Sequence, residues 1–521
     1  MKGNISYKIH KGKVKKEANY IPFRYIWAGF ITLAYIILII GVVVALCYFV
    51  PYFYIVAWIT QVAVVIKIFA SDDNPDYKIT WLLFVLVLPI VGFMLYFLFY
   101  SRKVHKKYVK RLKELKKREY IKDDSKEFSE LKKEDLCAFS QVKMLCSLSE
   151  SHLFKNTAVE YFSSGEEIYK RMLIDLNSAE RFIFMEYFII EEGVFWDSVL
   201  KILKTKAENG LDVRIVYDDI GCMRTLSGNY YKKLNQLGIK ATPFSRLKGR
   251  VDSEFNNRNH RKITVVDGYI GYTGGINIAD EYINRVERFG HWKDSGLRLE
   301  GEGVWELTKL FLTDYGINLI NPKDPDGNFY PSCEEKEARG FIVPFGDGPR
   351  PVYEYNVGKC VIKNMLASAN EYAYISTPYL IIDNDTCQSI ESAAMRGVDV
   401  RIILPHVPDK KIVFEMGKSF YARLQKVGVK IYEYESGFIH AKNYLVDDKY
   451  AMVGSINLDY RSLVHHFEDG VFMCRTECIG QIKADMESVI EKSILITEEM
   501  IKARLYKRVF RSIVRIFAPL L

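Results

Sequence analysis

The chain has 521 residues and a formal net charge of +9, which gives it room for two or three domains of ordinary size. Residues 1–120 carry a net charge of +13 and residues 501–521 carry +6, so residues 121–500 are near −10. A protein that tracks a nucleic-acid backbone places positive charge beside its working site, so this distribution argues against nucleic acid and favours an anionic membrane at the two ends.

The N-terminal part of the chain is apolar. From Tyr25 onward, 42 residues carry no formal charge, about twice the length that one helical span needs. Pro51 divides this run into residues 26–50 and 52–70, and a third apolar stretch covers residues 79–100. A signal peptide is excluded because the run is too long, starts late and is followed by no small-residue cleavage site.

The sequence predicts a membrane domain over residues 1–100 with two or three apolar helices. Both of its flanks are rich in lysine and arginine, so both should be cytoplasmic, which requires an even number of crossings. We expect one stretch to fail to cross, either as a re-entrant hairpin folded at Pro51 or as an interfacial helix; the alternative places the N-terminus outside. With the acidic turn at residues 71–78 outside, the prediction is a multi-pass protein of the cell membrane whose later domains are cytoplasmic.

Two charged segments flank the remaining chain. Residues 101–135 form a basic, mostly helical linker, and residues 496–521 alternate basic and apolar residues at near-helical spacing. A segment of the second kind can lie in the plane of a membrane interface. A surface helix docked on the neighbouring domain is the alternative.

One motif occurs twice in the region between these segments. Both copies have the pattern H-x-K-x4-D-x6-G-[GS]-I-N, the first running from His260 to Asn277 and the second from His440 to Asn457. A single copy is a weak signal, but two copies with the same downstream Gly and Asn are not accidental. Duplicated sets of a nucleophile and a cation suit displacement at phosphorus, where one histidine attacks and the other handles the proton.

The repeat extends to the segments around the motif. In each half an apolar β-rich segment precedes a helical stretch and a Gly-initiated strand, and a second helix and strand lead to the H-x-K. Strands that alternate with helices indicate α/β layers. The predicted fold class is therefore α/β, with two similar α/β domains at residues 136–335 and 336–495 sharing one active site, preceded by the transmembrane helices.

These motifs resemble the phospholipase D superfamily, whose mark is a paired H-x-K-x4-D. Finer features resemble the bacterial cardiolipin synthases; they are residues 256–262, 274–282, 289–294, 435–442, 454–462 and 466–468, together with the apolar N-terminus. The chain departs from the synthases at three points. His466 stands where they commonly have Asn, Ser455 replaces a common Thr, and an extra apolar stretch precedes the usual N-terminus.

The resemblance implies a phosphatidyltransferase that is a cardiolipin synthase. It would transfer a phosphatidyl group from one phosphatidylglycerol to another through a phosphohistidine, releasing glycerol and forming cardiolipin. The alternatives are a phospholipase D or a phosphatidyltransferase with a different acceptor alcohol. A nuclease of the superfamily and a catalytically inactive membrane scaffold are less favoured, because of the charge distribution and the two intact motifs.

The motif residues receive roles from this chemistry. We predict His260 as the nucleophile and His440 as general acid and then base; the near symmetry of the halves leaves the reverse assignment open. Lys262 and Lys442 would neutralise the phosphodiester and the developing charge. Two asparagines can donate amide hydrogens to the same oxygens, with turn formation after Gly as the alternative; they are Asn277 and Asn457.

An attacking imidazole needs a partner on its other nitrogen. Asp267 and Asp447 are candidates by motif. The resemblance instead implies Asp294 and Glu468 for this contact, which would leave the two motif aspartates a structural role in the turn beneath the site. The adjacent histidines at 465 and 466 are predicted to lie on the surface or to support the site.

No cofactor and no metal are expected. The chain has nine cysteines, scattered and without a C-x-x-C pair, which argues against both a disulfide framework and a zinc site. It also lacks an H-E-x-x-H and a Walker-type loop. The oligomeric state is not predicted.

Overall fold

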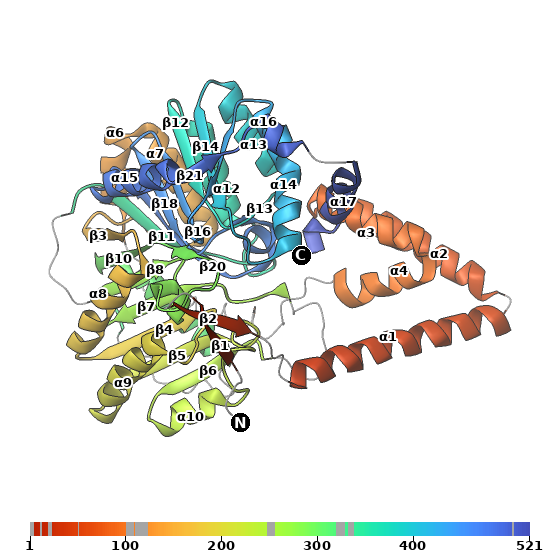
Figure 1. The fold of residues 1–521 in the computed structure, drawn as a ribbon, viewed down its shortest axis with the longest axis horizontal. Helices are drawn as coiled ribbons and strands as arrows, with labels where there is room; N and C mark the ends of the chain where they lie inside the picture. Colours follow the sequence, from red (N-terminus) through yellow and green to blue (C-terminus); the bar gives the residue numbers. More distant parts are fainter. Residues whose placement is uncertain are drawn as a thin grey trace.

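The computed structural model describes residues 5–10, 13–18, 23–50, 52–100, 109, 123–246, 256–318, 329–331, 338–502 and 505–520. Two α/β halves are stacked on one another, and a helical arm made of the N-terminal apolar segments projects to one side (Figure 1). A short hairpin precedes the arm and pairs β1 (Ile5–His10) with β2 (Lys13–Ala18).

The first half is built on a seven-stranded sheet in the order β3-β10-β8-β7-β4-β5-β6. Its strands are β3 (Thr157–Phe162), β4 (Phe182–Tyr187), β5 (Asp212–Asp218), β6 (Lys240–Phe244), β7 (Lys262–Val266), β8 (Ile270–Gly274) and β10 (Gly296–Gly301). Its helices are α8 (Gly165–Ser178), α9 (Val194–Glu208), α10 (Tyr230–Gln236) and α11 (Val304–Asn318). Strands β4, β5 and β6 run parallel, as expected where helices connect them.

The second half repeats this order in seven strands and adds an eighth, β21, at the edge. Its eight-stranded sheet runs β11-β20-β18-β17-β12-β14-β15-β21. The strands are β11 (Phe341–Asp347), β12 (Tyr372–Ser376), β14 (Asp399–Pro405), β15 (Lys430–Tyr434), β17 (Asn443–Val446), β18 (Tyr450–Gly454), β20 (Glu468–Cys474) and β21 (Ser493–Leu495). The helices are α12 (Val357–Ser368), α13 (Asn384–Met395), α14 (Lys411–Gln425) and α15 (Cys478–Glu491). The predicted α/β duplication is confirmed.

The inner faces of the two sheets meet in one hydrophobic core. Phe184, Val265 and Leu299 of the first sheet and Leu445 and Val453 of the second belong to this core and are fully buried. Alternate residues of the same strands point outward to the helices on either side, because successive strand residues face opposite ways. Burying such a side chain contributes about 1.5–3 kcal/mol, so the pairing of the halves is a strong constraint on the geometry between them.

The apolar arm contains two long helices and one broken stretch. Helices α1 (Phe23–Phe49) and α2 (Phe53–Ala70) are long and apolar enough to cross a membrane by length and composition. The third stretch instead forms α3 (Pro75–Val87), α4 (Pro89–Leu95) and a π-helical turn η1 (Tyr96–Tyr100). At 1.5 Å per residue α3 spans roughly 20 Å, short of the ~30 Å hydrocarbon layer.

The stretch that does not form one long helix is therefore the third, which breaks at Pro89. Pro51, where a hairpin was one of the predicted alternatives, lies outside the described residues. Leu88 leaves helical geometry just before Pro89, as the residue before a proline commonly does. A Cβ at Gly92 would lie 2.1 Å from the carbonyl oxygen of Phe84, so only glycine permits the two short helices to pack this closely.

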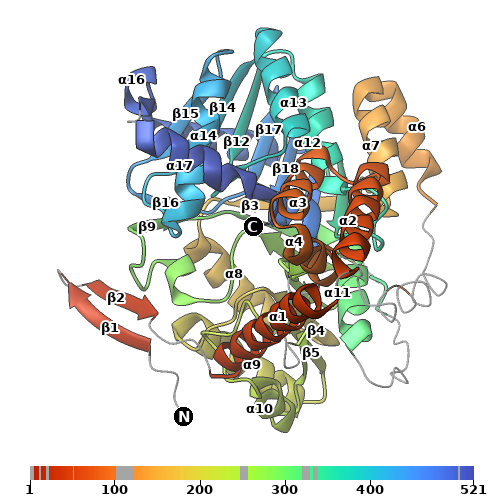
Figure 2. The ribbon, with the colours of Figure 1, turned by 90° about the vertical axis from the view of Figure 1, so that its right-hand side faces the viewer.

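Two further segments attach to the second half. Helices α6 (Ser125–Glu134) and α7 (Leu136–Ser149) bury their apolar residues in the outer core of the second half, although the sequence placed residues 136–149 in the first domain. The C-terminal helix α17 (Leu505–Ile516) docks on α14 and approaches α3 (Figure 2). Most of the predicted basic linker, residues 101–108 and 110–122, lies outside the described residues.

The contacts of α17 favour the docked-helix alternative for this segment. Arg511 forms an ion pair with Glu415 at 2.9 Å. Arg515 lies over the Phe420 ring, 4.4 Å from its centroid. The hydroxyl of Thr80 on α3 donates to the carbonyl oxygen of Ile516 at 2.8 Å, so α17 joins the apolar arm to the second half.

Candidate active site

Both motif histidines lie just before the central strands of their sheets, β7 and β17. A short backbone contact holds each of them to the opposite half. The amide of His260 donates to the carbonyl of Phe467 at 2.8 Å, and the amide of His440 donates to the carbonyl of Lys293 at 2.7 Å. Strands β9 (His291–Lys293) and β16 (Gly437–Ile439) pair in parallel beside the second contact. The halves are thus joined at the two predicted catalytic histidines.

Each histidine hydrogen-bonds to a carboxylate from the other half. The Nδ1 atom of His260 lies 2.9 Å from Oε2 of Glu468, and that of His440 lies 2.7 Å from Oδ2 of Asp294. Both carboxylates are fully buried. The resemblance pointed to these two carboxylates, but nothing in the sequence said that they would cross between the halves.

The two sets share one electrostatic environment. Burial lowers the pKa of His260 well below its ordinary value, and the charges of Lys262 and Lys442 lower that pKa further. Burial also lowers the pKa of His440 to about 4, where the charge of Lys442 outweighs the opposing charge of Asp294. The lysine of one half therefore acts on the histidine of the other, as the predicted sharing of one phosphate by both sets requires.

The histidines are neutral in the substrate-free site and their tautomer follows from their partners. Because Nδ1 faces a carboxylate in both, Nδ1 carries the hydrogen and Nε2 keeps a free lone pair. Burial would raise the pKa of Asp294, but its electrostatic interaction with the His440 imidazole, the charge of Lys442 and the hydrogen bond from His440 hold that pKa below its ordinary value. A neutral imidazole held by an ionised carboxylate is a competent nucleophile or base.

The two motif lysines are buried beside the histidines. Lys262 is 2% exposed and Lys442 is 1% exposed, and each donates to the carbonyl of its own motif histidine. Burial lowers the pKa of Lys262 to about 8 and that of Lys442 to about 7. An anionic phosphodiester between them would favour their charged forms, so anion binding and lysine protonation reinforce each other.

The side-chain amides of the two motif asparagines differ in their hydrogen-bond partners. The amide of Asn277 accepts from the backbone of Ile189 at 3.0 Å and donates to the hydroxyl of Tyr282 at 2.7 Å. Asn457 is 5% exposed, and its Oδ1 is buried without a hydrogen-bond partner in the described part of the chain. The phosphate-binding role stays a prediction for both.

Asp267 and Asp447 lie in the turns that follow β7 and β17, with φ of 53° and 50°. Asp267 accepts three backbone hydrogen bonds, from residues 180, 181 and 182, at 2.7–2.9 Å. Asp447 accepts the equivalent three, from residues 370, 371 and 372. Each carboxylate thereby fixes the start of the neighbouring strand, β4 or β12, and is fully engaged there.

We expect Asp267→Ala to lower the stability of the protein and to leave kcat per folded molecule unchanged. Losing the acceptor of three backbone N–H groups should cost about 2 kcal/mol or more, which corresponds to a fall of roughly 4–8 °C in the melting temperature for a domain of this size. Asp267→Asn, which keeps one acceptor oxygen and tolerates positive φ, should lose less. Thermal unfolding in detergent measures this; a kcat per folded molecule reduced a hundredfold would show a catalytic role instead.

Aromatic rings that the sequence did not single out enclose the two imidazoles. The ring of Phe188 lies 5.1 Å from that of His260, and the rings of Tyr282 and Trp292 each lie 5.5 Å from that of His440. They supply part of the burial that lowers both histidine pKa values. Nothing in their local pattern separates them from ordinary core aromatics, so only the fold reveals them.

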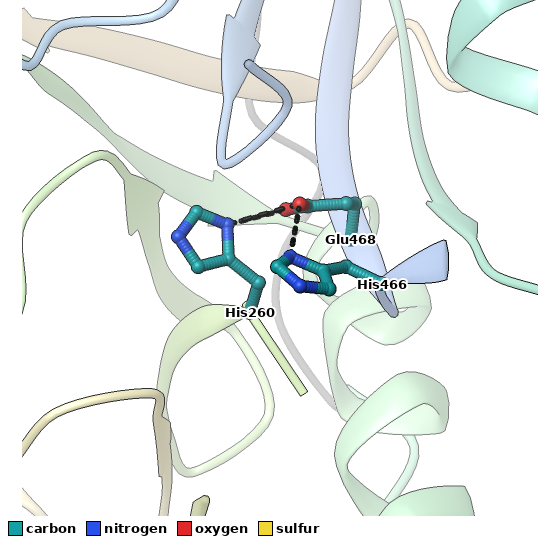
Figure 3. Close-up of side chains that lie close together, drawn as sticks. All are labelled: His260, His466 and Glu468. Atoms are coloured by element: carbon teal, nitrogen blue, oxygen red, sulfur yellow. Dashed lines mark hydrogen bonds and ion pairs between the residues drawn. The ribbon is translucent and has the colours of Figure 1, made fainter. Parts of the chain in front are cut away.

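The third histidine, His466, is buried beside the first and does not lie on the surface. It is 6% exposed, as is His465. The ligand atoms of His260, His466 and Glu468 lie within 4.8 Å of one another (Figure 3). Two imidazoles and a carboxylate are a set that can hold Zn²⁺. Because His260 and Glu468 are 208 positions apart in the sequence, no motif spacing could have indicated the group.

A duplicated α/β fold with two converging histidine–lysine sets defines a phospholipase D-like protein. The family model described as "Cardiolipin synthase, PLD-like domain" matches residues 172–287 and 362–490, and a "Phospholipase_D-nuclease N-terminal" model matches residues 54–99. The two segments matched by the cardiolipin synthase model contain the two histidine–lysine sets. The segment matched by the N-terminal model covers most of α2 and continues to η1.

Comparison with similar proteins assigns the chain to one family within the phospholipase D-like class. A cardiolipin synthase of Halalkalibacterium halodurans is 32% identical over 90% of this chain and 94% of its own length, and cardiolipin synthase 1 of Staphylococcus epidermidis is 30% identical over 90% and 97%. An uncharacterised protein of Streptococcus mutans is 40% identical over 85% and 96%. The chain belongs to the cardiolipin synthase family.

A solved structure shares the fold. The phosphatidylserine synthase of Haemophilus influenzae superposes with a TM-score of 0.56 at 16% identity, covering 74% of this chain and 98% of that one. At this identity the likeness concerns the arrangement of the halves alone.

Proposed function

We propose that the protein makes cardiolipin from two molecules of phosphatidylglycerol by a double displacement at phosphorus. The observation that carries the proposal is the pair of crossed units, in which His260 with Glu468 and His440 with Asp294 face one site together with both motif lysines. Two oriented imidazoles are what a two-step transfer needs, since one forms the covalent bond and the other moves the proton.

In the first step Nε2 of His260 attacks the phosphorus of one phosphatidylglycerol. The N–P bond forms while the P–O bond to the glycerol headgroup breaks, and the leaving oxygen takes a proton from His440. Lys262 and Lys442 offset the charge that develops on the phosphoryl oxygens. Although the pKa of His440 is low in the empty site, a bound anion raises it and favours the protonated form.

In the second step the neutral His440 accepts the proton of the terminal hydroxyl of a second phosphatidylglycerol. That oxygen attacks phosphorus, the N–P bond breaks and His260 is regenerated, which yields cardiolipin. His440 ends protonated, ready for the next leaving group. Because the halves are nearly symmetric, the two histidines can exchange these roles without changing the balance.

The membrane arm favours lipid substrates. Helices α1 and α2 are exposed and apolar along most of their length, as expected for segments that face lipid, and the second half is tied to this arm through α3 and α17. We propose a multi-pass protein of the cell membrane whose two α/β halves face the cytoplasm. Holding the site at the interface presents both lipids and limits water as a competing acceptor.

Expression in a cell that lacks cardiolipin tests the proposal. The wild-type chain should restore cardiolipin in extracted lipids, and purified protein with labelled phosphatidylglycerol should release one glycerol for each cardiolipin formed. Phosphatidic acid as the sole product would show hydrolysis instead. A product that carries another alcohol would show a different acceptor.

A further inference from the structure

The two orienting carboxylates have matching neighbours. A residue with a ring N–H lies two positions before each of them: Trp292 before Asp294 and His466 before Glu468. The residue in between gives its carbonyl to the amide of the motif histidine in both halves. The segments 292–294 and 466–468 therefore occupy equivalent places across the duplication.

Their geometry matches as well as their position. Nε1 of Trp292 lies 3.5 Å from Oδ2 of Asp294, and Nδ1 of His466 lies 3.6 Å from Oε1 of Glu468. The Trp292 ring packs on His440 with centroids 5.5 Å apart at 47°, and the His466 ring packs on His260 at 5.4 Å and 42°. Figure 3 shows Nδ1 of both His260 and His466 directed at the Glu468 carboxylate.

The two equivalent rings, the indole of Trp292 and the imidazole of His466, differ in their hydrogen-bonding chemistry. An indole is a donor only and does not titrate, whereas an imidazole has two nitrogens and two tautomers. Both ring nitrogens of His466 are buried without a hydrogen-bond partner in the described part of the chain. Burial lowers the pKa of His466 to about 3, so the ring is neutral and has one N–H to direct. Buried groups of this kind call for a functional explanation.

We propose that His466 is a positioning residue for His260 and acts through Glu468, with its Nδ1–H as the second ring donor to that carboxylate. A small rotation of the ring brings the 3.6 Å separation into hydrogen-bond range. The inference rests on the proposed function, because it assigns His466 to the step in which His260 attacks phosphorus.

The second donor tunes the basicity of His260. A carboxylate that accepts from His466 as well as from His260 stabilises the protonated form of His260 less, so His260 stays a neutral nucleophile. Losing the donor and its ring should raise the pKa of His260, through a stronger carboxylate partner and through entry of water. The charged and titratable groups that act on these two rings are Glu468, Lys262, Lys442, His440, Lys410 and Arg461.

Three substitutions at this position separate the donor from the ring. The amide nitrogen of asparagine can take the place of Nδ1, glutamine reaches instead toward the place of Nε2, and alanine removes both. Relative to wild type, kcat of His466→Ala should fall about tenfold, the size of one hydrogen bond to a charged group, with KM little changed. Its acid limb in the pH profile of kcat/KM should move upward by up to about one unit.

His466→Asn should restore both the rate and the pH profile, and His466→Gln should behave like alanine. Wild-type rate and profile in His466→Ala would overturn the proposal, as would equal recovery by Asn and Gln, since packing alone would then suffice. Thermal unfolding establishes that each variant is folded. His152→Ala, which loses a histidine–glutamate contact of 2.8 Å to Glu306 away from the site, serves as the matched control.

Two further outcomes are distinguishable. If a chelator abolishes wild-type activity and added Zn²⁺ restores it, His260, His466 and Glu468 hold an ion and the proposal is overturned. If the wild type makes no cardiolipin, the proposed function fails, while the pH profile of whichever product forms still decides the role of His466.

Discussion

Replacing His260 or His440 with alanine is expected to abolish cardiolipin formation, with kcat reduced by at least about 10⁴-fold. Without His260 no covalent intermediate forms, and without His440 neither the leaving glycerol nor the attacking hydroxyl exchanges its proton. The loss should not be additive, because the two imidazoles act in one sequence of bonds. Cardiolipin formation by detergent-solubilised variants, at matched folded concentration, measures this.

The same variants assign the nucleophile. A phosphatidyl ester of nitrophenol labelled at phosphorus, whose leaving group needs no proton, should leave label on the protein in His440→Ala, where the second displacement is blocked, and none in His260→Ala. Label on His440 in the His260→Ala variant would show that His440 is the nucleophile and that His260 handles the proton. Undiminished product from either variant would contradict a shared site.

Neutralising the crossed carboxylates should have the next largest effect. We expect Asp294→Asn and Glu468→Gln each to lower kcat by roughly 10²–10⁴-fold, as for the buried carboxylate that orients a catalytic histidine. Asp294 is in the first half, yet its loss should impair His440 in the second, because their side chains are 2.7 Å apart. An effect of Asp294→Asn confined to the first-half histidine would contradict the crossed arrangement.

The pH profile gives the sign of the Asp294 effect. The charge of Asp294 and its hydrogen bond raise the pKa of His440 against burial, so Asp294→Asn should lower that pKa further. The general acid is then lost at lower pH, and the alkaline limb of kcat/KM moves to lower pH. Asp485→Asn is the control, since this carboxylate bonds Lys293 and Tyr161 and touches neither motif histidine; its alkaline limb should stay in place.

The duplicated fold could be predicted from the sequence because the same motif occurs at the same place in two similar series of strand and helix segments. The histidine and lysine of each motif lead into the strands β7 and β17, and the apolar segments before them became β4, β5, β12 and β14. Local alternation of strands and helices is a short-range property that residue pattern encodes directly. The break of the third apolar stretch at Pro89 was missed, because overall hydropathy outweighed a single proline in a run of otherwise suitable length.

Residue type and spacing were enough to predict the reactive groups of this protein, namely two imidazoles and two ammonium groups, and the apolar arm that precedes them. The packing of the halves was needed to show which carboxylate bonds which histidine, and that His466 occupies the place in one half that Trp292 occupies in the other. Those pairings join residues 146 to 208 positions apart, and they exist because the inner faces of the two sheets bury a common core. Contacts of that range depend on how the halves pack, which no local pattern of residues records.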